Sequence, residues 1–192
     1  MPLRATDNAL VLPLLGLLLE NPRHQYGLLT ELRNRYGRRV RTGSLYTLVG
    51  SLREAGWIEQ ADRDRAPIDD KAPPVVFRLT PAGRDEFTRR VAADLTDTDP
   101  TNATRFVNAL AYIGILDRDA AIKTLDARID ALKQRAEEWE SSIATSGIDP
   151  IYMIEADFVT SQTRHDMTWL QQFIERISDT NYAWPADDRL AP

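Results

Sequence analysis

Apolar residues recur at helical spacing within the stretch RTGSLYTLVGSLREAGWI, which runs from Arg41 to Ile58. Thr42 is a suitable N-cap for a helix here, and Gly56 suits the left-handed position that follows a helix. The apolar positions fall at i, i+3, i+4 and i+7 and form one stripe: Leu45, Leu48, Val49 and Leu52. Gly50 lies inside the predicted helix, where glycine costs about 1 kcal/mol relative to alanine. The stretch therefore predicts a short amphipathic helix whose backbone approaches another surface at this glycine.

The outer face of this predicted helix is small and rich in hydroxyl groups. It consists of Gly43, Thr47, Gly50 and Glu54, with Ser44, Tyr46, Ser51 and Arg53 at its margins. A helix that lies in the DNA major groove fits this composition, because hydroxyl groups there reach phosphates and base edges. Five arginines crowd just before the helix: Arg33, Arg35, Arg38, Arg39 and Arg41. Their number favours a basic surface that contacts nucleic acid over a basic face that is merely solvated. We call this expected surface the electrostatic footprint.

Two further helices are predicted before this one. The segment from Leu10 to Leu19 is apolar on nearly every side, so it must be buried on every side. A small domain meets that demand most easily if one face packs inside and another contacts a second chain. Pro13 either begins or bends this helix. A second short helix is predicted from Leu28 to Tyr36, and we interpret His24 as an exposed turn residue rather than a ligand.

A β-hairpin and a fourth helix follow. Two segments rich in strand formers predict the hairpin: residues 57–61 and 75–79. The loop from Asp62 to Pro74 carries three cations among its aspartates: Arg63, Arg65 and Lys71. These cations could contact DNA phosphates. Alternatively, they could simply be solvated, because the acidic and basic charges of the loop nearly cancel. Thr80-Pro81 signals the start of another helix, which we expect to end near Asp94. Together these elements predict a winged helix-turn-helix domain over residues 1–95.

The second half of the chain is predicted to be helical. The polar segment TDTDPT, residues 96–101, marks the expected domain boundary, and a helix from Arg105 to Leu116 follows it. The next helix, capped by Asp117, keeps apolar residues at alternating spacings of three and four: Ile122, Leu125, Ile129, Leu132, Ala136, Trp139 and Ile143. A last helix begins at Asp149-Pro150. We expect an antiparallel, coiled-coil-like hairpin that forms a helical dimerisation domain over residues 101–180, and a flexible tail over residues 181–192. The predicted fold class is mainly α with a small β-hairpin wing.

Composition and charge narrow the class of protein. Apolar residues make up 43% of the 192 residues, which is enough for a core, and the absence of cysteine excludes disulfides and thiolate metal sites. We expect a cytoplasmic protein without a signal peptide or a membrane span. The net charge of −5 is unevenly placed, because residues 1–95 hold 15 Lys/Arg and 12 Asp/Glu whereas residues 96–192 hold 9 and 17. This asymmetry suggests that the basic N-terminal half carries the main function and that the acidic C-terminal half has an accessory role.

Four sequence motifs occur in a recognisable order: LGLLLE, QYGLLTELRNRYG, TGSLYTLVGSLREAGWIE and FRLTPAG. In this order and spacing they resemble the PadR family of bacterial winged-helix transcriptional regulators. Val76-Phe77 stands where the family often has two tyrosines, and the wing loop is long. The resemblance implies a homodimer held by the C-terminal helices and the first helix. It also implies binding to a promoter palindrome on double-stranded DNA, usually as a repressor, with release by a small aromatic or cationic effector.

The expected site residues follow from both arguments. We expect base-edge contacts from Ser44, Tyr46 and Thr47, although Tyr46 could equally be a core residue. The residues expected to position phosphates are Tyr26, Arg38, Arg39, Arg41 and Thr42. Two such helices related by a two-fold axis should lie about 34 Å apart, one turn of DNA.

Alternatives remain at the level of sequence. An effector site lined by Trp139, Trp169 and Phe173, with Trp184 as a further candidate, competes with ordinary packing of a helical stripe. An enzyme is disfavoured, because the chain has only two histidines, no phosphate-binding glycine loop, no HExxH motif and no nucleophile elbow. No cofactor or metal ion is expected. The alternative function is a winged-helix protein–protein interaction adaptor without sequence-specific DNA binding.

Overall fold

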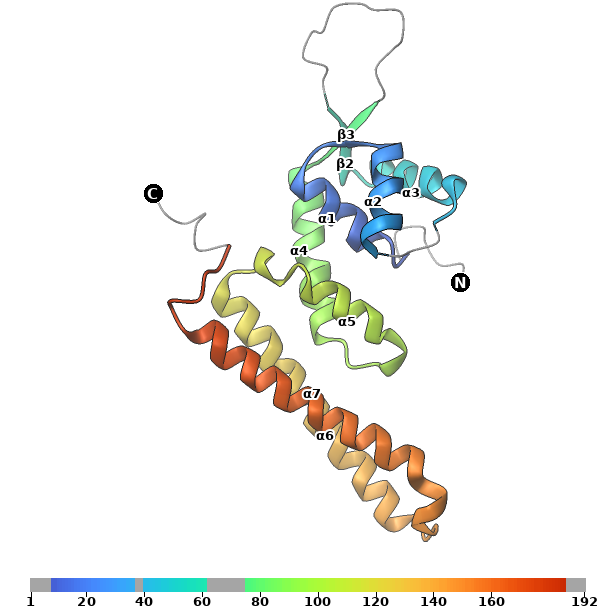
Figure 1. The fold of residues 1–192 in the computed structure, drawn as a ribbon, viewed down its shortest axis with the longest axis vertical. Coiled ribbons are helices and arrows are strands. Elements are labelled where there is room, and N and C mark those ends of the chain that lie inside the picture. The colour runs from blue at the N-terminus through green and yellow to red at the C-terminus, as the bar shows by residue number, and fades with distance from the viewer. Residues whose placement is uncertain (1–7, 37–39, 62–74, 186–192) are drawn as a thin grey trace, which may run out of the picture. The chain divides into compact units, whose positions relative to one another are not determined.

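The computed structural model describes residues 8–36, 40–61 and 75–185 of the chain. This part is mainly helical and contains a small three-stranded antiparallel sheet (Figure 1). The predicted fold class is confirmed. The chain divides into two compact units, Met1–Val91 and Ala92–Pro192. In the described ranges, none of the helices combines the length and the apolar character that a bilayer span requires.

The N-terminal unit has the element order of a winged helix. Its helices are α1 (Val11–Glu20), α2 (Gln25–Tyr36), α3 (Thr42–Glu54) and the start of α4 (Pro81–Thr96). Its strands are β1 (Arg23–His24), β2 (Ile58–Gln60) and β3 (Val76–Leu79). The strand order is β1-β3-β2 and both pairings are antiparallel. The predicted hairpin is confirmed, whereas β1 was not predicted, because two residues are too short to show a period.

Helix α1 is buried on every side within the single chain. All residues from Val11 to Leu18 are buried, and the helix packs against α2 and β3. Pro13 lies in the first turn, where its missing N–H group is not needed. The expectation that the burial of this helix is met most easily by contact with a second chain is therefore wrong. A single chain buries the apolar residues of α1 from Val11 to Leu18. This helix therefore gives no argument for a dimer, and such an argument must come from other surfaces.

Helix α4 is anchored to the carbonyl groups that follow α3. The Thr80 Oγ1 accepts the N–H of Gly83 at 2.9 Å and donates to the carbonyl oxygen of Gly56 at 2.7 Å. The backbone N–H of Thr80 donates to the carbonyl oxygen of Trp57 at 3.1 Å. Gly56 has a φ of 73°, as expected for the residue that ends a helix. The predicted Thr80 cap is thus confirmed, and it also fixes α4 to the chain that leads into β2.

Charged side chains on α4 add to this anchor. The Arg90 guanidinium lies 5.0 Å from the centroid of the Trp57 ring and donates to Glu86 at 2.6 Å. Hydrogen bonds from Arg89, and then from Arg90, hold the pKa of the Glu86 carboxyl below its usual value, although its partial burial opposes this shift. Arg90 therefore joins the α4 surface to the tryptophan next to β2.

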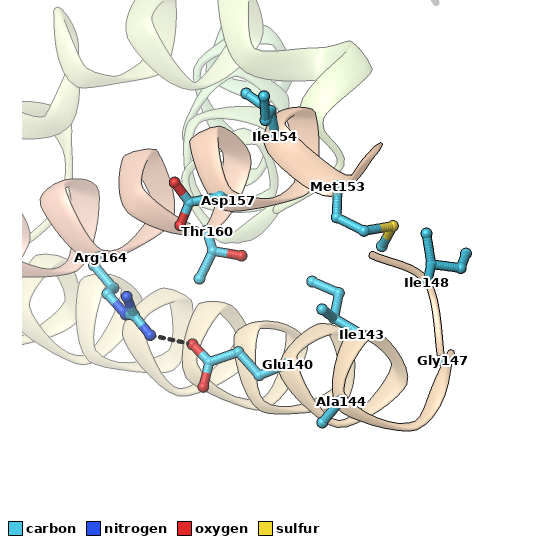
Figure 2. A pocket seen from close by; sticks show the side chains of 10 residues that line it. All are labelled: Glu140, Ile143, Ala144, Gly147, Ile148, Met153, Ile154, Asp157, Thr160 and Arg164. Atoms are coloured by element: carbon cyan, nitrogen blue, oxygen red, sulfur yellow. Dashed lines mark hydrogen bonds and ion pairs between the residues drawn. The ribbon is translucent and has the colours of Figure 1, made fainter. Parts of the chain in front are cut away.

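The C-terminal unit is built on a long helical hairpin. Its helices are α5 (Ala103–Leu110), α6 (Arg118–Thr145) and α7 (Ile154–Ser178), with short 3₁₀ turns at η2 (Pro100–Asn102), η3 (Ile113–Ile115) and η4 (Pro150–Met153). Helices α6 and α7 run antiparallel and pack along their lengths (Figure 1), which confirms the predicted hairpin. The helix predicted over 105–116 instead ends at Leu110 and continues as the η3 turn. A cavity of about 630 Å³ opens at the tip of the hairpin (Figure 2).

The predicted heptad seam of α6 is buried only in part. Leu125, Leu132 and Ala136 are buried, but Trp139 exposes 41% of its surface. Arg128 takes a buried position that the apolar pattern did not predict, and only 6% of it is exposed. Its guanidinium donates to the carbonyl oxygens of Leu95 and Asp97. The structure thus places a cation inside this unit.

The surroundings of Arg128 explain how the cation is accommodated. Its guanidinium lies 3.7 Å from the centroid of the Phe106 ring, a cation–π arrangement that is stronger when water is excluded. Burial lowers the pKa of Arg128, and the carboxylates of Asp166 and Asp97 act in the opposite direction. Arg128 therefore joins α6 to both α5 and the end of α4.

The chain after α7 is held against this unit as far as Pro185. Trp184 exposes only 4% of its surface, and its indole N–H donates to the carbonyl oxygen of Leu116 at 2.9 Å. Arg118 donates to the carbonyl oxygens of Ile177 and Tyr182, at 2.7 and 2.8 Å. The tail predicted from residue 181 thus begins with packed residues, and residues 186–192 lie outside the described part.

Candidate nucleic-acid interface

Helix α3 separates an apolar face from a polar face, as its sequence predicts. Its buried residues are Leu45, Leu48, Val49 and Leu52. On the opposite side Thr42, Ser44 and Thr47 are exposed, and Tyr46 exposes 56% of its surface. The alternative in which Tyr46 belongs to the core is therefore wrong. The helix presents a row of hydroxyl groups that no other part of the described chain covers.

These hydroxyl groups keep capacity for further hydrogen bonds. Thr47 donates to the carbonyl oxygen of Gly43 at 3.1 Å, so its own oxygen can still accept a hydrogen bond. Arg41, with an extended backbone at φ −78° and ψ 137°, occupies the N-cap position, and no side chain caps the helix. The predicted N-cap role of Thr42 is wrong, because the backbone becomes helical one residue earlier than expected. The Thr42 hydroxyl is thus not used as a cap.

Within the described part of the chain, the two glycines of α3 have no packing reason. A Cβ atom added at Gly43 or at Gly50 would meet no atom within 4 Å. Gly50 is therefore kept small neither by the core nor by a neighbouring element. The observation agrees with the interpretation that the α3 backbone approaches an external surface.

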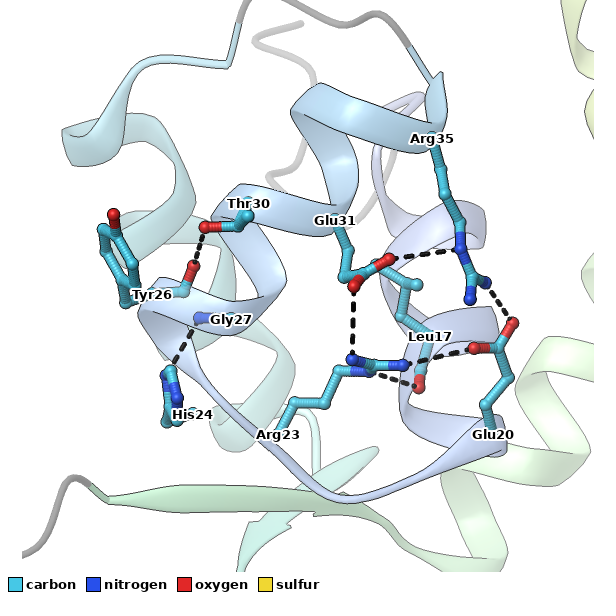
Figure 3. A network of polar contacts seen from close by, with 9 residues as sticks. All are labelled: Leu17, Glu20, Arg23, His24, Tyr26, Gly27, Thr30, Glu31 and Arg35. Carbon is cyan, nitrogen blue, oxygen red and sulfur yellow. Dashed lines mark hydrogen bonds and ion pairs between the residues drawn. The ribbon is translucent and has the colours of Figure 1, made fainter.

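The five arginines before α3 do not form one free cluster. Arg35 makes ion pairs with Glu20 at 2.5 Å and with Glu31 at 3.1 Å (Figure 3). Arg33 donates to the carbonyl oxygen of Val40 at 2.8 Å. The predicted footprint is wrong for Arg35, because two carboxylates already neutralise its charge.

Arg41 is exposed at the start of α3. The other cations assigned to phosphate contact lie outside the described residues: Arg38, Arg39, Arg63, Arg65 and Lys71. Their assignment stays a prediction.

The end of α1, the strand β1 and helix α2 are linked by alternating charges. Arg23 pairs with Glu20 at 3.3 Å and with Glu31 at 3.6 Å, and Arg35 contacts the same two carboxylates (Figure 3). These side chains are only partly buried, so each pair contributes little alone, and their value lies in forming a network. The network orients α2, and through it the start of the helix-turn-helix.

His24 and Tyr26 have distinct roles at the start of α2. The His24 Nδ1 accepts the N–H of Gly27 at 2.9 Å and so caps the first turn of the helix (Figure 3). The interpretation of His24 as an exposed turn residue is wrong, because it is half-buried and belongs to β1. Tyr26 exposes 74% of its surface and stacks on the His24 ring at 6.4 Å between centroids. Its hydroxyl is available for a phosphate contact.

The comparison with protein families covers this same region. Residues 14–89 match the model of the transcriptional regulator PadR-like family. Residues 14–89 of the winged helix are thus similar to the PadR-like family. The resemblance carried by the four sequence motifs is therefore confirmed, and the matched residues run from α1 into α4.

Several solved structures are similar to this chain at low sequence identity. Bacillus subtilis PadR in complex with operator DNA is 17% identical, with a TM-score of 0.40, over 88% of this chain and 99% of that one. The same regulator in complex with p-coumaric acid is 15% identical, with a TM-score of 0.36, over 90% and 100%. A PadR-like transcriptional regulator from Bacillus cereus is 15% identical, with a TM-score of 0.37, over 88% and 97%. No curated protein matches the chain.

The aromatic residues assigned to an effector lie outside the PadR-like domain. Trp169 and Phe173 stack on α7 with 5.3 Å between ring centroids, and Trp139 is exposed on α6. The cavity at the tip of the hairpin is lined by other residues, so an effector site at the three aromatics stays a prediction. Sequence reasoning missed this cavity. Its only signal is Thr160, where the apolar pattern of α7 gives way to polar residues.

Proposed function

We propose that this chain is a homodimeric, sequence-specific DNA-binding transcriptional regulator that acts in the cytoplasm as a repressor on a promoter palindrome. The observation that carries the proposal is the exposed hydroxyl-bearing face of α3 in a PadR-like winged helix. The DNA major groove is about 12 Å wide and admits an α-helix. Small residues on the exposed face let the helix backbone approach the base edges, and the hydroxyl groups both donate and accept hydrogen bonds.

The charges next to α3 support the same orientation. Arg41 is exposed at its N-terminal end and Arg53 at its C-terminal end, so cations lie at both ends of the hydroxyl row. The Arg53 guanidinium lies 5.9 Å from the centroid of the Phe77 ring, which holds it next to the wing strand β3. Phosphate contacts of this kind position a helix on DNA, whereas base contacts select the sequence.

The case for a homodimer rests on an apolar stripe that runs from the η4 turn into the first turns of α7. Ile151, Ile154 and Phe158 follow helical spacing, and they expose 61%, 59% and 69% of their surfaces. Large apolar side chains gathered on one helix face are uncommon on the surface of a monomer. A second copy of the chain is the occupant that we propose, because a two-fold dimer presents two α3 helices to half-sites about 34 Å apart.

The dimer is tested by replacing Phe158 with serine. We expect the dissociation constant of the dimer to rise by about 30-fold, because a central aromatic side chain at an interface contributes about 2 kcal/mol. Sedimentation equilibrium at several protein concentrations measures the change. The exposed Gln172 on the same helix provides a matched control, Gln172→Ser, which should leave the constant unchanged. A wild-type chain that sediments as a monomer at all concentrations would contradict the proposal.

Base readout is tested by the double variant Ser44→Ala/Thr47→Ala. We expect about tenfold weaker binding to a duplex from the region upstream of the chain's own gene, because two hydrogen-bonding hydroxyls are lost. Fluorescence anisotropy measures the affinity, and an unrelated duplex of equal length should show almost no change. Thr88→Ala on α4 is a matched control, because Thr88 also donates to the carbonyl oxygen four residues earlier, at 3.0 Å.

A second variant in the same assay separates phosphate contact from base readout. Arg41→Ala should weaken binding to every duplex and reduce the salt dependence by about one unit of slope. Equal affinity of the wild type for both duplexes would contradict sequence-specific recognition. Failure to bind either duplex would favour the adaptor alternative.

A further inference from the structure

Helix α2 begins with an unusual cap, the imidazole ring of His24. Residues preferred at this position carry a side-chain oxygen that accepts an N–H group of the first turn. Here the His24 Nδ1 takes that role and accepts the Gly27 N–H at 2.9 Å (Figure 3). Gly27 is the third residue of α2, so the hydrogen bond has the spacing of an ordinary N-cap. The cap therefore depends on a nitrogen that can be protonated.

The first turn of α2 is fitted to this ring. A Cβ atom added at Gly27 would lie 3.3 Å from the His24 Cε1, which is tighter than most contacts of a Cβ atom. The Tyr26 ring stacks on the imidazole, with an angle of 19° between the ring planes. On strand β1, His24 pairs with Val76 of β3. His24 thus connects the sheet to the residue of α2 that we expect to contact a phosphate.

Within the described part of the chain, no carboxylate is paired with the ring to stabilise an added proton. On α2 the titratable group that faces the ring is the Tyr26 phenol, and the residue opposite on β3, Val76, is apolar. The carboxylates of Glu20 and Glu31 are engaged by arginines (Figure 3). The hydrogen bond from Gly27 therefore favours the neutral ring, and no ion pair opposes this preference.

Protonation of Nδ1 removes the cap. An imidazole ring with a proton on each nitrogen has two donors and no acceptor, so the Gly27 N–H loses its partner. The added positive charge also lies at the N-terminal end of a helix, where the helix dipole favours negative charge. Both effects disfavour the present arrangement of the first turn once the ring is charged.

We propose that His24 is a positioning residue for DNA binding, and that only its neutral form holds Tyr26 in place for a phosphate contact. This inference rests on the proposed function, because it requires that the winged helix binds DNA. With the proton on Nε2, Nδ1 caps α2 and the stacked Tyr26 ring is held at the surface. With both nitrogens protonated, the first turn loosens and Tyr26 is released. DNA affinity therefore falls as the pH falls, whereas an added cation in contact with phosphate would strengthen binding.

The cap is tested first without DNA, by NMR spectroscopy of the ¹⁵N-labelled full chain. The chemical shifts of the imidazole nitrogens report which nitrogen carries the proton. We expect the Nε2–H tautomer of His24 at about pH 8, and a Gly27 amide signal that titrates together with the ring down to about pH 5.5. The chain has two histidines, so His24→Asn identifies the His24 ring by removing its signals. An Nδ1–H tautomer, or a Gly27 amide that does not follow the ring, would overturn the proposal.

The effect on DNA is measured by fluorescence anisotropy with the duplex from upstream of the chain's own gene. Between about pH 8 and about pH 5.5 the wild type should lose about tenfold in affinity, through the lost cap and the unfavourable charge. His24→Asn keeps an N-cap acceptor that does not titrate, so its affinity should change less than about twofold over this range. His165→Gln removes the other histidine, which is exposed on α7, and should keep the wild-type pH dependence.

A variant at Tyr26 separates positioning from loss of fold. Tyr26→Phe should bind weakly at both pH values and lose most of the pH dependence, because the contact that the cap supports is already absent. Circular dichroism at both pH values checks that each variant remains folded. A full pH dependence in Tyr26→Phe would show that His24 does not act through the phenol and would overturn the proposal.

The remaining outcomes are distinguishable. Stronger binding of the wild type at acidic pH, with the salt dependence increased by about one unit of slope, would show that the charged ring contacts a phosphate and would overturn the proposal. Equal pH dependence in the wild type and in His24→Asn would overturn it as well. If the wild type binds no duplex at either pH, the proposed function and the positioning role both fail, while a Gly27 amide that titrates with the ring still establishes the pH-dependent cap.

Discussion

Replacing Gly83 by alanine is expected to destabilise the N-terminal unit by about 3 kcal/mol or more, because overpacking against backbone cannot be relieved by a rotamer change. A Cβ atom at this position would overlap the carbonyl group of Trp57. That carbonyl oxygen also accepts the Thr80 N–H, so moving it breaks a hydrogen bond of the α4 anchor. The glycine of the FRLTPAG motif is thus explained by a close approach between α4 and the chain that enters β2.

Thermal unfolding followed by circular dichroism measures this effect. A loss of about 3 kcal/mol corresponds to a fall in Tm of roughly 10–20 °C for a unit of this size. The matched control is Gly50→Ala, the same substitution at a position where the added atom meets nothing within 4 Å. This control should raise stability by up to about 1 kcal/mol, because alanine favours the helix. An unchanged Tm in Gly83→Ala would show that the carbonyl group of Trp57 can move at little cost.

Gly50→Ala also bears on the DNA interface. If the α3 backbone approaches DNA at this glycine, the variant will be more stable than the wild type yet bind the operator less tightly. Opposite signs in the two measurements separate a packing role from a contact role for the same residue.

Replacing Arg128 by methionine is expected to destabilise the C-terminal unit by about 3 kcal/mol. Methionine keeps the aliphatic stem but removes the donors to the carbonyl oxygens of Leu95 and Asp97. Buried acceptors left without a partner cost about 1–3 kcal/mol each, and the cation–π contact with Phe106 is lost as well. Removal of a buried charge recovers part of this cost, since its desolvation is no longer needed.

Urea unfolding of the full chain measures the effect of Arg128→Met. Lys133→Met, at an exposed position of the same helix, is the control and should change stability by less than about 0.5 kcal/mol. Arg128→Lys should fall between the two, because lysine keeps a charge but lacks the planar group that stacks on a ring and donates in two directions. If Arg128→Met is as stable as the wild type, the buried guanidinium contributes no net stability.

Local signals in the sequence predicted most elements of the PadR-like domain. The stripe from Leu45 to Leu52, the Gly56 that ends α3 and the Thr80-Pro81 start of α4 all match the structure. These features depend on backbone preferences and on periodicity within a few residues, so they are visible without the rest of the chain. The long hairpin of α6 and α7 was predicted for the same reason.

The sequence by itself determined where helices and the wing form, and which face of α3 is polar. Only the tertiary structure decided which partners the side chains meet. It pairs Arg35 with Glu20, buries Arg128, closes α1 within one chain, and leaves a cavity between Ile143 and Thr160. Such contacts join residues far apart in the chain. Hydrophobic periodicity and helix-capping residues do not reveal these contacts, because the contacts depend on how whole helices and strands pack.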